Sequence, residues 1–468
     1  MKNTYRNIIE RAALCGAISL LLTGCGSGTV PNGTSGEKNP KENQAQTEAV
    51  VKEVEVYAVA EYPAEPVFKD EDERWDYRQA RHQALTEDFV ESYEEFAIET
   101  SAELLKTMEG NTVYSPLSLY YALAMAADGA KGETQEEILD LLGYDNADNL
   151  AADCKSSFES LYYVPNEANN KPNEWGEYAA DSRYQLMIAN SLWADDAITL
   201  KKDFADNAAK NFYADVFKGD LQSKETAVKK SQWVTERTNG LITPSDEPAD
   251  PMALLSIINT IYFYDEWVNR FNKEETAEDM FTCADGTKVN CDFMNRIEFS
   301  GGFRRGETYT ASSLSLKNGQ MIFVLPNEGV DVHDLVRDAD TLEDVLVDGG
   351  ESLFGKITWK VPKFSYGSEL ALADMLKVLG MEEAFSSNAD FSAISDMKPL
   401  AISNIKQNAR LGIDEDGVEG AAFTEILFCG AALPKDEAEM ILDRPFLYAV
   451  RNNGQIVFTG ICENPTAE

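Results

Sequence analysis

The chain has 468 residues, and its 41 basic residues against 81 acidic ones give a formal net charge of −40. Phosphate backbones and anionic lipid repel such a chain, which argues against a nucleic-acid partner and against membrane adsorption by charge alone. Hydrophobic residues make up 44% of the composition, which is ordinary for a globular protein with a real core.

The first residues are expected to direct export rather than to fold. A basic stretch precedes the apolar run Ala12–Leu22, which is too short to span a bilayer comfortably. The following Leu22-Thr23-Gly24-Cys25 resembles the lipobox of bacterial lipoproteins, in which the chain is cleaved before a cysteine that is then acylated. This resemblance implies that residues 1–24 are a lipoprotein signal peptide. Lipid on Cys25 would anchor an exported protein to the outer face of the bacterial cell membrane; a plain secretory signal and an uncleaved anchor are the alternatives.

Residues 25–87 are expected to form a lipid-anchored flexible tether. Residues 26–46 are rich in Gly, Pro, Asn, Ser and charge, so they cannot bury enough apolar surface to fold. The stretch Val50–Phe68 alternates in places and can form a transient strand, whereas Asp70–Gln83 is too charged for a core and is a candidate helical lead-in.

The cysteines suggest neither a metal site nor a complete disulfide framework. Six cysteines follow residue 24; with Cys25 lipidated five remain, so at least one stays unpaired within the chain. Cys283 and Cys291 flank the turn signal Asp285-Gly286, but a symmetric hairpin would not place them opposite each other. A disulfide there stays open. No spacing resembles a zinc site, and neither a metal nor another cofactor is expected.

The sequence also lacks the residues that most enzymes need. Its two histidines, His82 and His333, lie in a charged stretch and in a polar turn. No GxSxG, HExxH, Walker or GxGxxG motif accompanies them. Carboxylates are so abundant that no catalytic pair can be singled out. The chain is therefore not expected to be an enzyme.

Helices dominate the first part of the organised chain, which begins near residue 88. Phe89–Lys106 places its apolar residues at helical spacing. Thr112–Gly143 predicts a short strand, then a helix that starts at a proline and stops at Gly129.

Antiparallel strands dominate the later part. Leu254–Tyr264 is a continuous apolar run, typical of a strand buried on both faces. Hairpins are predicted at Asn318-Gly319 and at Asn453-Gly454. Ser352–Gly367 predicts a further strand, followed by a helix over Glu369–Met381. The fold class is therefore α+β.

Over residues 88–468 the chain resembles a serpin, a serine protease inhibitor. The matching stretches keep the order and spacing of the family; they are Asn111–Thr134, Ala189–Trp193, Thr238–Ile242, Ile257–Phe263 with Trp267, Phe323–Gly329, Val361–Ser365, Ala389–Ser395 and Arg444–Pro465. The resemblance implies the serpin fold, with three β-sheets, about nine helices and an exposed reactive-centre loop in one domain.

The resemblance also implies a function, inhibition of a target serine protease that cleaves this loop. The front half of the loop then inserts into the large sheet while the protease is held as a covalent acyl-enzyme. The expected partner is thus a serine protease, and the inhibitor is expected to be a monomer that binds no nucleic acid. The alternative is a non-inhibitory serpin that serves as a surface binding protein.

The stretch Asp414–Pro434 meets what insertion requires. The resemblance assigns the hinge to Glu415, Gly417, Val418, Gly420, Ala421, Ala422 and Thr424. Because strand side chains alternate between faces, one face would carry only uncharged residues: Val418, Gly420, Ala422, Thr424, Ile426 and Phe428. Both charges lie on the other face, with Glu419, Ala421, Phe423, Glu425, Leu427 and Cys429.

Family spacing, counted from the hinge, places the cleaved bond at Ala431–Ala432. A small residue before the bond suits the narrow specificity pocket of elastase-like proteases. Gly430–Ala431 is the nearest rival, and cleavage after Phe428 would instead suit a chymotrypsin-like enzyme.

Further residues match the family regions that hold the sheet closed. Ser115, Ser118 and Asn259 match the shutter region, and Trp267 matches a tryptophan near the point where the loop inserts. Gln407 stands where the family usually has a histidine, so pH dependence due to that histidine should be absent. A capping serine, a satisfied buried asparagine and simple core packing of the tryptophan are the alternatives.

Overall fold

The computed structural model describes residues 53–82, 85–169, 184–249, 251–403, 405–418 and 436–467, all within one compact unit. Nine α-helices occur in these ranges: α2 (Glu71–His82), α3 (Glu87–Leu105), α4 (Pro116–Gly129), α5 (Gly132–Leu141), α6 (Ala147–Leu161), α7 (Lys202–Asn211), α8 (Lys224–Arg237), α9 (Ala339–Glu343) and α10 (Ala373–Val378). Shorter helical turns are η1 (Glu167–Asn169), η3 (Lys273–Glu275), η4 (Val332–Leu335), η5 (Asp344–Asp348) and η6 (Glu383–Phe385).

The strands form three sheets, as expected. The five-stranded sheet has the order β1 (Glu55–Ala58), β4 (Ala214–Gly219), β3 (Gln185–Asp195), β5 (Leu255–Glu266) and β13 (Gly417–Val418). A separate pair contains β11 (Phe364–Ala371) and β12 (Lys406–Ile413). The nine-stranded sheet has the order β14 (Asp436–Ile441), β10 (Glu351–Pro362), β7 (Lys288–Arg305), β8 (Tyr309–Ser315), β9 (Gly319–Pro326), β15 (Phe446–Asn452), β16 (Gln455–Cys462) and β2 (Thr112–Tyr114), with β6 (Ala277–Thr282) paired to β7.

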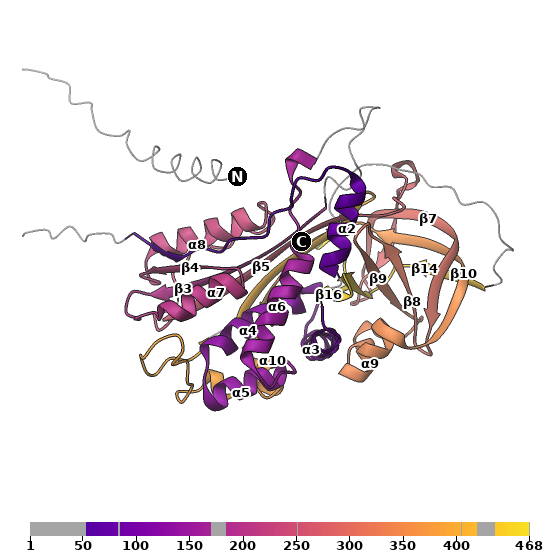
Figure 1. The fold of residues 1–468 in the computed structure, drawn as a ribbon. Helices are drawn as coiled ribbons and strands as arrows, with labels where there is room; N and C mark the ends of the chain where they lie inside the picture. Colours follow the sequence, from indigo (N-terminus) through magenta and orange to yellow (C-terminus); the bar gives the residue numbers. More distant parts are fainter. Residues whose placement is uncertain are drawn as a thin grey trace, which may run out of the picture. The chain divides into compact units, whose positions relative to one another are not determined.

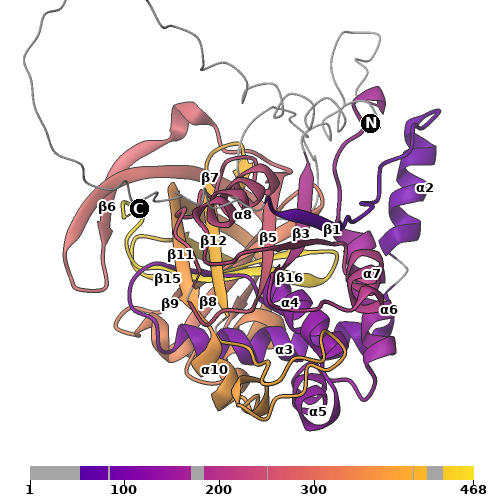
Figure 2. The ribbon, with the colours of Figure 1, turned by 90° about the vertical axis from the view of Figure 1, so that its left-hand side faces the viewer.

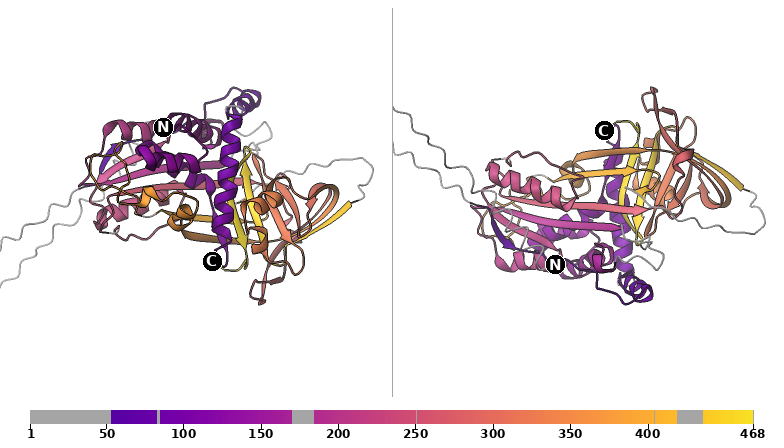
Figure 3. Two further views of the ribbon diagram at one scale, coloured as in Figure 1. Left: turned by 90° about the horizontal axis from the view of Figure 1, so that it is seen from below. Right: turned by 90° about the horizontal axis from the view of Figure 1, so that it is seen from above.

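Helices cover both faces of the five-stranded sheet. Figure 1 shows α8 on one face and α4 on the other, and the two views of Figure 3 show these faces in turn. Between α8 and the sheet lies a small apolar cluster: Ala189, Trp193, Phe217, Leu221, Trp233 and Val234. The main core lies on the α4 side and continues into the nine-stranded sheet. Because helices cover both faces of this sheet, its strands are rich in apolar residues.

Local signals place most of the predicted elements correctly. Thr86 caps α3, since its side chain accepts from the N–H of Phe89, and Pro116 opens α4. Asn453 and Gly454 both have positive φ angles of 47° and 77°, as a type I′ hairpin requires. The helix predicted over Glu369–Met381 is shorter, because β11 continues to Ala371.

The prediction that β5 is buried on both faces is wrong for the first half of the strand. Residues 260–266 are buried, but residues 255–259 are only half-buried. The reason is that β12 runs next to β5 (Figure 2) without pairing with it, so one edge of β5 lacks a neighbouring strand here.

Residues 53–82 belong to the fold, which corrects the predicted domain boundary. β1 pairs antiparallel with β4, and Glu55 and Val56 lie opposite Lys218 and Phe217. Strand β1 thereby becomes the outer edge of the five-stranded sheet. The predicted flexible tether is therefore wrong for residues 53–82; residues 25–52 lie outside the described residues.

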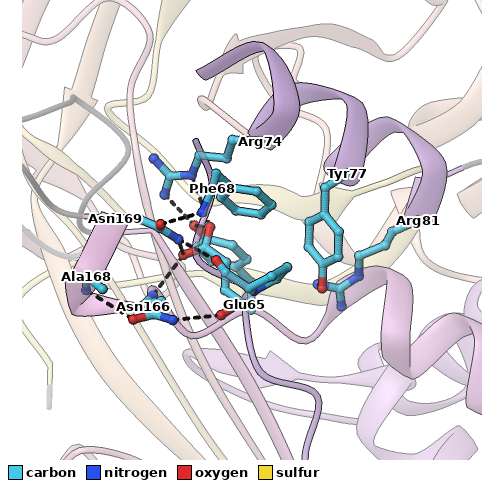
Figure 4. A network of polar contacts seen from close by, with 10 residues as sticks. Glu65, Phe68, Arg74, Tyr77, Arg81, Asn166, Ala168 and Asn169 are labelled. Atoms are coloured by element: carbon cyan, nitrogen blue, oxygen red, sulfur yellow. Dashed lines mark hydrogen bonds and ion pairs between the residues drawn. The ribbon is translucent and has the colours of Figure 1, made fainter. Parts of the chain in front are cut away.

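A buried carboxylate fixes this segment to the rest of the domain (Figure 4). Glu65, which is 4% exposed, accepts from Arg74 Nε at 3.0 Å, from the Tyr163 hydroxyl at 2.5 Å and from the Asn166 N–H at 2.8 Å. Asn169 Nδ2 donates to it at 3.0 Å. Burial alone would raise the pKa of Glu65, but these partners outweigh it and hold the pKa below its usual value.

Candidate functional site

The hinge of the predicted loop lies at the end of β5. β13 pairs antiparallel with this strand, with Gly417 opposite Glu266 and Val418 opposite Asp265. Val418 is 1% exposed and belongs to the core. A Cβ atom on Gly417 would lie 2.3 Å from the carbonyl oxygen of Asp265, so this close approach of two backbones requires glycine. The first residues of the predicted hinge are thus seated against the central sheet.

Two buried carboxylates hold the chain just before β13. Glu415 Oε2 lies 3.1 Å from Lys363 Nζ, and Glu415 Oε1 accepts from the Thr276 hydroxyl at 2.9 Å. Asp416 pairs with Lys273 at 2.6 Å. Burial would raise the pKa of Glu415, but hydrogen bonds from the backbone, from Thr276 and from Lys363 together hold that pKa below its usual value.

Trp267 holds the same segment through its backbone and its indole. Its Nε1 donates to the carbonyl of Asp414 at 2.9 Å, and its backbone N–H donates to the carbonyl of Asp416 at 3.2 Å. The ring is 1% exposed and packs edge-on against Phe271. Trp267 therefore contacts the hinge directly, in addition to packing in the core.

The end of β5 carries a charged cluster that the sequence reasoning missed. Asp265 accepts from the backbone N–H of Asn318 at 2.8 Å. Glu266 pairs with Arg270 at 3.1 Å and also with Lys317. The signal was present in the sequence, where two acidic residues directly follow the apolar run of β5. Two of their partners, Lys317 and Asn318, lie on a hairpin about fifty residues later, whereas Arg270 is at position i+4 from Glu266.

A cavity of about 60 Å³ lies between β5 and β12, above α4. Residues that line it include Ser118, Ala122, Leu255, Ile257, Asn259 and Gln407. Because β5 and β12 belong to different sheets in the described structure, their facing edges are not joined by a ladder of hydrogen bonds. An additional strand placed between them would find backbone partners on both sides.

Of the predicted shutter residues, Ser118, Asn259 and Gln407 line this cavity, and Ser115 contacts Gln407. Gln407 Oε1 accepts from the Ser115 N–H at 2.8 Å, and Gln407 Nε2 donates to the Ser115 carbonyl at 2.9 Å. The amide thereby joins β12 to the start of α4. Ser115 also caps α4 by accepting from the Ser118 N–H, and its hydroxyl donates to the Val457 carbonyl at 2.7 Å.

Asn259 reaches the cavity from β5. Its Nδ2 donates to Asn190 on β3, while its buried Oδ1 has no hydrogen-bond partner among the described residues. Gly420, Ala421, Ala422, Thr424, the predicted bond Ala431–Ala432 and its rivals all lie outside the described residues.

The cysteines that the structure describes form no disulfide with one another. Cys154, Cys283, Cys291 and Cys462 are free and buried, so no disulfide joins Cys283 to Cys291. Burial raises the pKa of the Cys291 thiol to about 11. Within the described ranges, no cluster of three or more His, Cys, Asp or Glu could hold a metal ion, and no helix is long and apolar enough to cross a membrane.

Comparison with known proteins decides the family. Residues 91–465 match the family model described as Serpin (serine protease inhibitor). The chain is a serpin. Serpins are in general serine protease inhibitors rather than catalysts.

Curated relatives and solved structures agree with this assignment. This serpin is 27% identical to serpin A3-8 of Bos taurus over 398 residues, covering 82% of this chain and 91% of the relative. It is 30% identical to an alpha-1-antitrypsin-like protein of Tamias sibiricus, covering 76% of this chain and 84% of the relative. The native state of the thermophilic serpin Tengpin has a TM-score of 0.71 at 25% identity and covers 88% of this chain and 100% of its own. Thyroxine-binding globulin in complex with thyroxine shares the fold, with a TM-score of 0.66 at 24% identity, covering 81% of this chain and 99% of its own.

Proposed function

We propose that this serpin is an inhibitor that traps elastase-like serine proteases as a suicide substrate. The observation that carries the proposal is the seated hinge: Val418 already pairs with β5 as an uncharged, buried residue. The cavity between β5 and β12 lies on the side of the sheet where β13 adds to β5. A loop strand that continued β13 would therefore extend toward it.

The chemistry of the trap belongs to the protease, and the inhibitor supplies the conformational change. The nucleophile of the protease attacks the carbonyl of Ala431, releases the amine of Ala432 and forms an acyl-enzyme. Loop insertion then displaces the protease before water hydrolyses the ester. Burial of Ile426 and Phe428 contributes about 1.5–3 kcal/mol each, and each new ladder hydrogen bond contributes about 0.5–1.5 kcal/mol. Summed over the inserted segment, the free energy released by insertion is on the order of ten kcal/mol, which is comparable to the folding stability of a whole domain.

Incubation with pancreatic elastase tests this proposal. The expected result is a covalent complex that survives denaturing electrophoresis, together with a C-terminal fragment whose mass shows that it begins at Ala432. A fragment that begins at Ala431 or at Cys429 would move the bond to one of its rivals. Complete cleavage without any complex would contradict inhibition and favour a serpin that acts as a binding protein.

We also propose that the protein is exported and held at the outer face of the bacterial membrane by lipid on Cys25. The proposal is supported by the Leu22-Thr23-Gly24-Cys25 motif. Cys25→Ser removes the thiol that would be acylated, so the variant should lose metabolic labelling with palmitate and leave the membrane fraction. A variant that stays in the membrane fraction as firmly as the wild type would argue for an uncleaved anchor.

A further inference from the structure

Two exposed phenylalanines mark one face of the nine-stranded sheet. Phe299 is 66% exposed and Phe354 is 59% exposed, and no other phenylalanine of the described residues is among the exposed large apolar side chains. Ile297, on the same strand as Phe299, is 51% exposed. Scattered apolar residues on a surface are ordinary, but adjacent ones indicate a contact site. Ile297, Phe299 and Phe354 are called the outer patch below.

The pairing of β7 with β10 places the outer patch on a single face. Ile297 pairs with Thr358 and Phe354 pairs with Gly302, and Phe299 lies between these pairs, at a bulge that separates the pair Glu298–Ile357 from the pair Gly301–Gly355. Between these pairs Gly301 and Ile357 are buried and Glu298 is half-buried, which places these residues on the core side. Because side chains alternate along a strand, the outer patch faces away from the core. A Cβ atom on Gly302 would meet nothing within 4 Å, so the surface beside Phe354 is open.

The chain that follows the reactive loop returns next to the outer patch. β14 begins at Asp436, which pairs with Gly355, the residue after Phe354. A Cβ atom on Gly355 would lie 1.8 Å from the Asp436 carbonyl oxygen, so the two backbones meet closely here. Ala432 precedes Asp436 by four residues, and an extended chain spans at most about 3.6 Å per residue. The proposed bond is therefore tethered within about 15 Å of this point.

A bound protease is large compared with that distance. A protease domain of about 220 residues has a radius of gyration of about 17 Å. An enzyme whose active site holds Ala431 must therefore lie close to the surface around Phe354. We propose that the outer patch is a second contact surface for the target protease, which it engages while the loop occupies the active site. This inference rests on the proposed function and adds to it a determinant of partner choice outside the loop.

The chemistry of the outer patch suits an apolar contact with a polar rim. Two phenylalanines provide the kind of rigid aromatic side chain that dominates binding at interface centres. Lys356, two residues after Phe354 on the same face of β10, lies 3.8 Å from Glu437 of β14, so an ion pair lies beside the apolar side chains. We therefore expect the patch to act on the stability of the docked complex, and not on the insertion step that follows.

The experiment separates docking from trapping. Pancreatic elastase whose active-site serine is replaced by alanine cannot form an acyl-enzyme, so its dissociation constant reports docking alone. The full chain is compared with the double variant Phe299→Ser/Phe354→Ser. The matched control is Val378→Ser, which removes a 69% exposed apolar side chain from α10; Figure 1 shows this helix well away from β10 and β14. All three proteins should melt at the same temperature, since the replaced side chains lie at the surface.

We expect the double variant to bind the inactive elastase at least ten-fold more weakly, whereas Val378→Ser binds like the wild type. With active elastase the association rate should fall by the same factor, and the number of inhibitor molecules consumed per enzyme should not change. Equal dissociation constants, or no docking by the wild type, would overturn the proposal. Dimers or adsorption to phosphatidylglycerol vesicles that vanish in the double variant would assign the patch to a second copy or to the membrane, and would also overturn it.

The two hypotheses fail in different ways. If the wild type docks through the outer patch but forms no covalent complex, the result supports the contact surface and contradicts the inhibitory function. If covalent complexes form equally fast in all three proteins, the result supports the inhibitory function and contradicts the role of the outer patch.

Discussion

Val418 decides, at the scale of single residues, whether the loop can enter the sheet. It is the first inward residue of the predicted strand, and its side chain is already buried against β5. Val418→Arg would bring an unpaired charge to this buried position, at a cost of several kcal/mol. We expect elastase to cleave the variant without being trapped, with at least a ten-fold loss of covalent complex on denaturing gels. Phe423→Arg, which places the same charge on the opposite face, should still trap the enzyme; equal loss in both would refute this account of the faces.

Glu415 should make the hinge sensitive to acid. Its pKa is held below the usual value, so its contribution to stability is fully present above the unfolded pKa, near 4.5. That contribution is lost as the pH falls through the lower, folded pKa. Glu415→Gln removes the charge, and at pH 7 it should lower stability by about 1–3 kcal/mol.

Thermal melting between pH 7 and pH 3 measures this effect. The difference in melting temperature between the wild type and Glu415→Gln should close as the pH falls below about 4.5. A gap that is constant over this range would mean that the carboxylate charge does not matter. Lys406→Gln is the control, because Lys406 is an exposed side chain of β12 away from this carboxylate cluster.

The proximity of several residues was predictable where a family motif contains them, and their roles in insertion stay predictions. The structure brings Ser115, Ser118 and Gln407 into one network, and it seats Glu415 and Val418 at the end of β5. The pairing of Asp265 with Asn318 and of Glu266 with Lys317 was missed because these two partners come from a distant hairpin. Residue type and local spacing carry no information about such a pairing.

Glu65 stabilises the N-terminal segment at the scale of elements. Glu65→Ala would leave the Arg74 guanidinium buried without its carboxylate, which typically costs about 3–5 kcal/mol. We expect β1 and α2 to lose their protection in hydrogen–deuterium exchange. Lys69→Ala removes an exposed ion pair with Asp70 and should change stability by less than about 1 kcal/mol. Exchange that is fast over residues 54–81 in the wild type would show that this segment is a tether after all.

The helices and hairpins were predictable because their signals are local, whereas the N-terminal segment was not. Thr86, Pro116 and Asn453-Gly454 act within a few residues of themselves. Glu65 instead depends on Tyr163, which follows it by 98 residues. In the sequence, Glu65 is simply one more acid in an acidic stretch. The gap beside β5 was missed for a related reason, since an apolar run does not reveal which of its edges will be paired.

At the scale of the whole molecule, the proposed mechanism requires that the intact protein is not at its most stable arrangement. Cleavage of the loop by a protease that escapes trapping should allow insertion between β5 and β12. Because insertion would release free energy on the order of ten kcal/mol, the melting temperature of the cleaved protein should rise by about 10 °C or more. Differential scanning calorimetry of intact and cleaved protein checks this expectation, and an unchanged melting temperature would contradict it. Cleaved Val418→Arg is the control and should not gain stability.

The position of β15 and β16 inside the nine-stranded sheet has a consequence for the severed chain. Both strands follow the proposed bond, yet each pairs with neighbours on both sides, and their side chains are almost entirely buried. The C-terminal fragment after cleavage therefore remains paired and buried within the nine-stranded sheet. A spent inhibitor should sediment as a single intact particle in native buffer, and its two pieces should separate only once the whole molecule is unfolded.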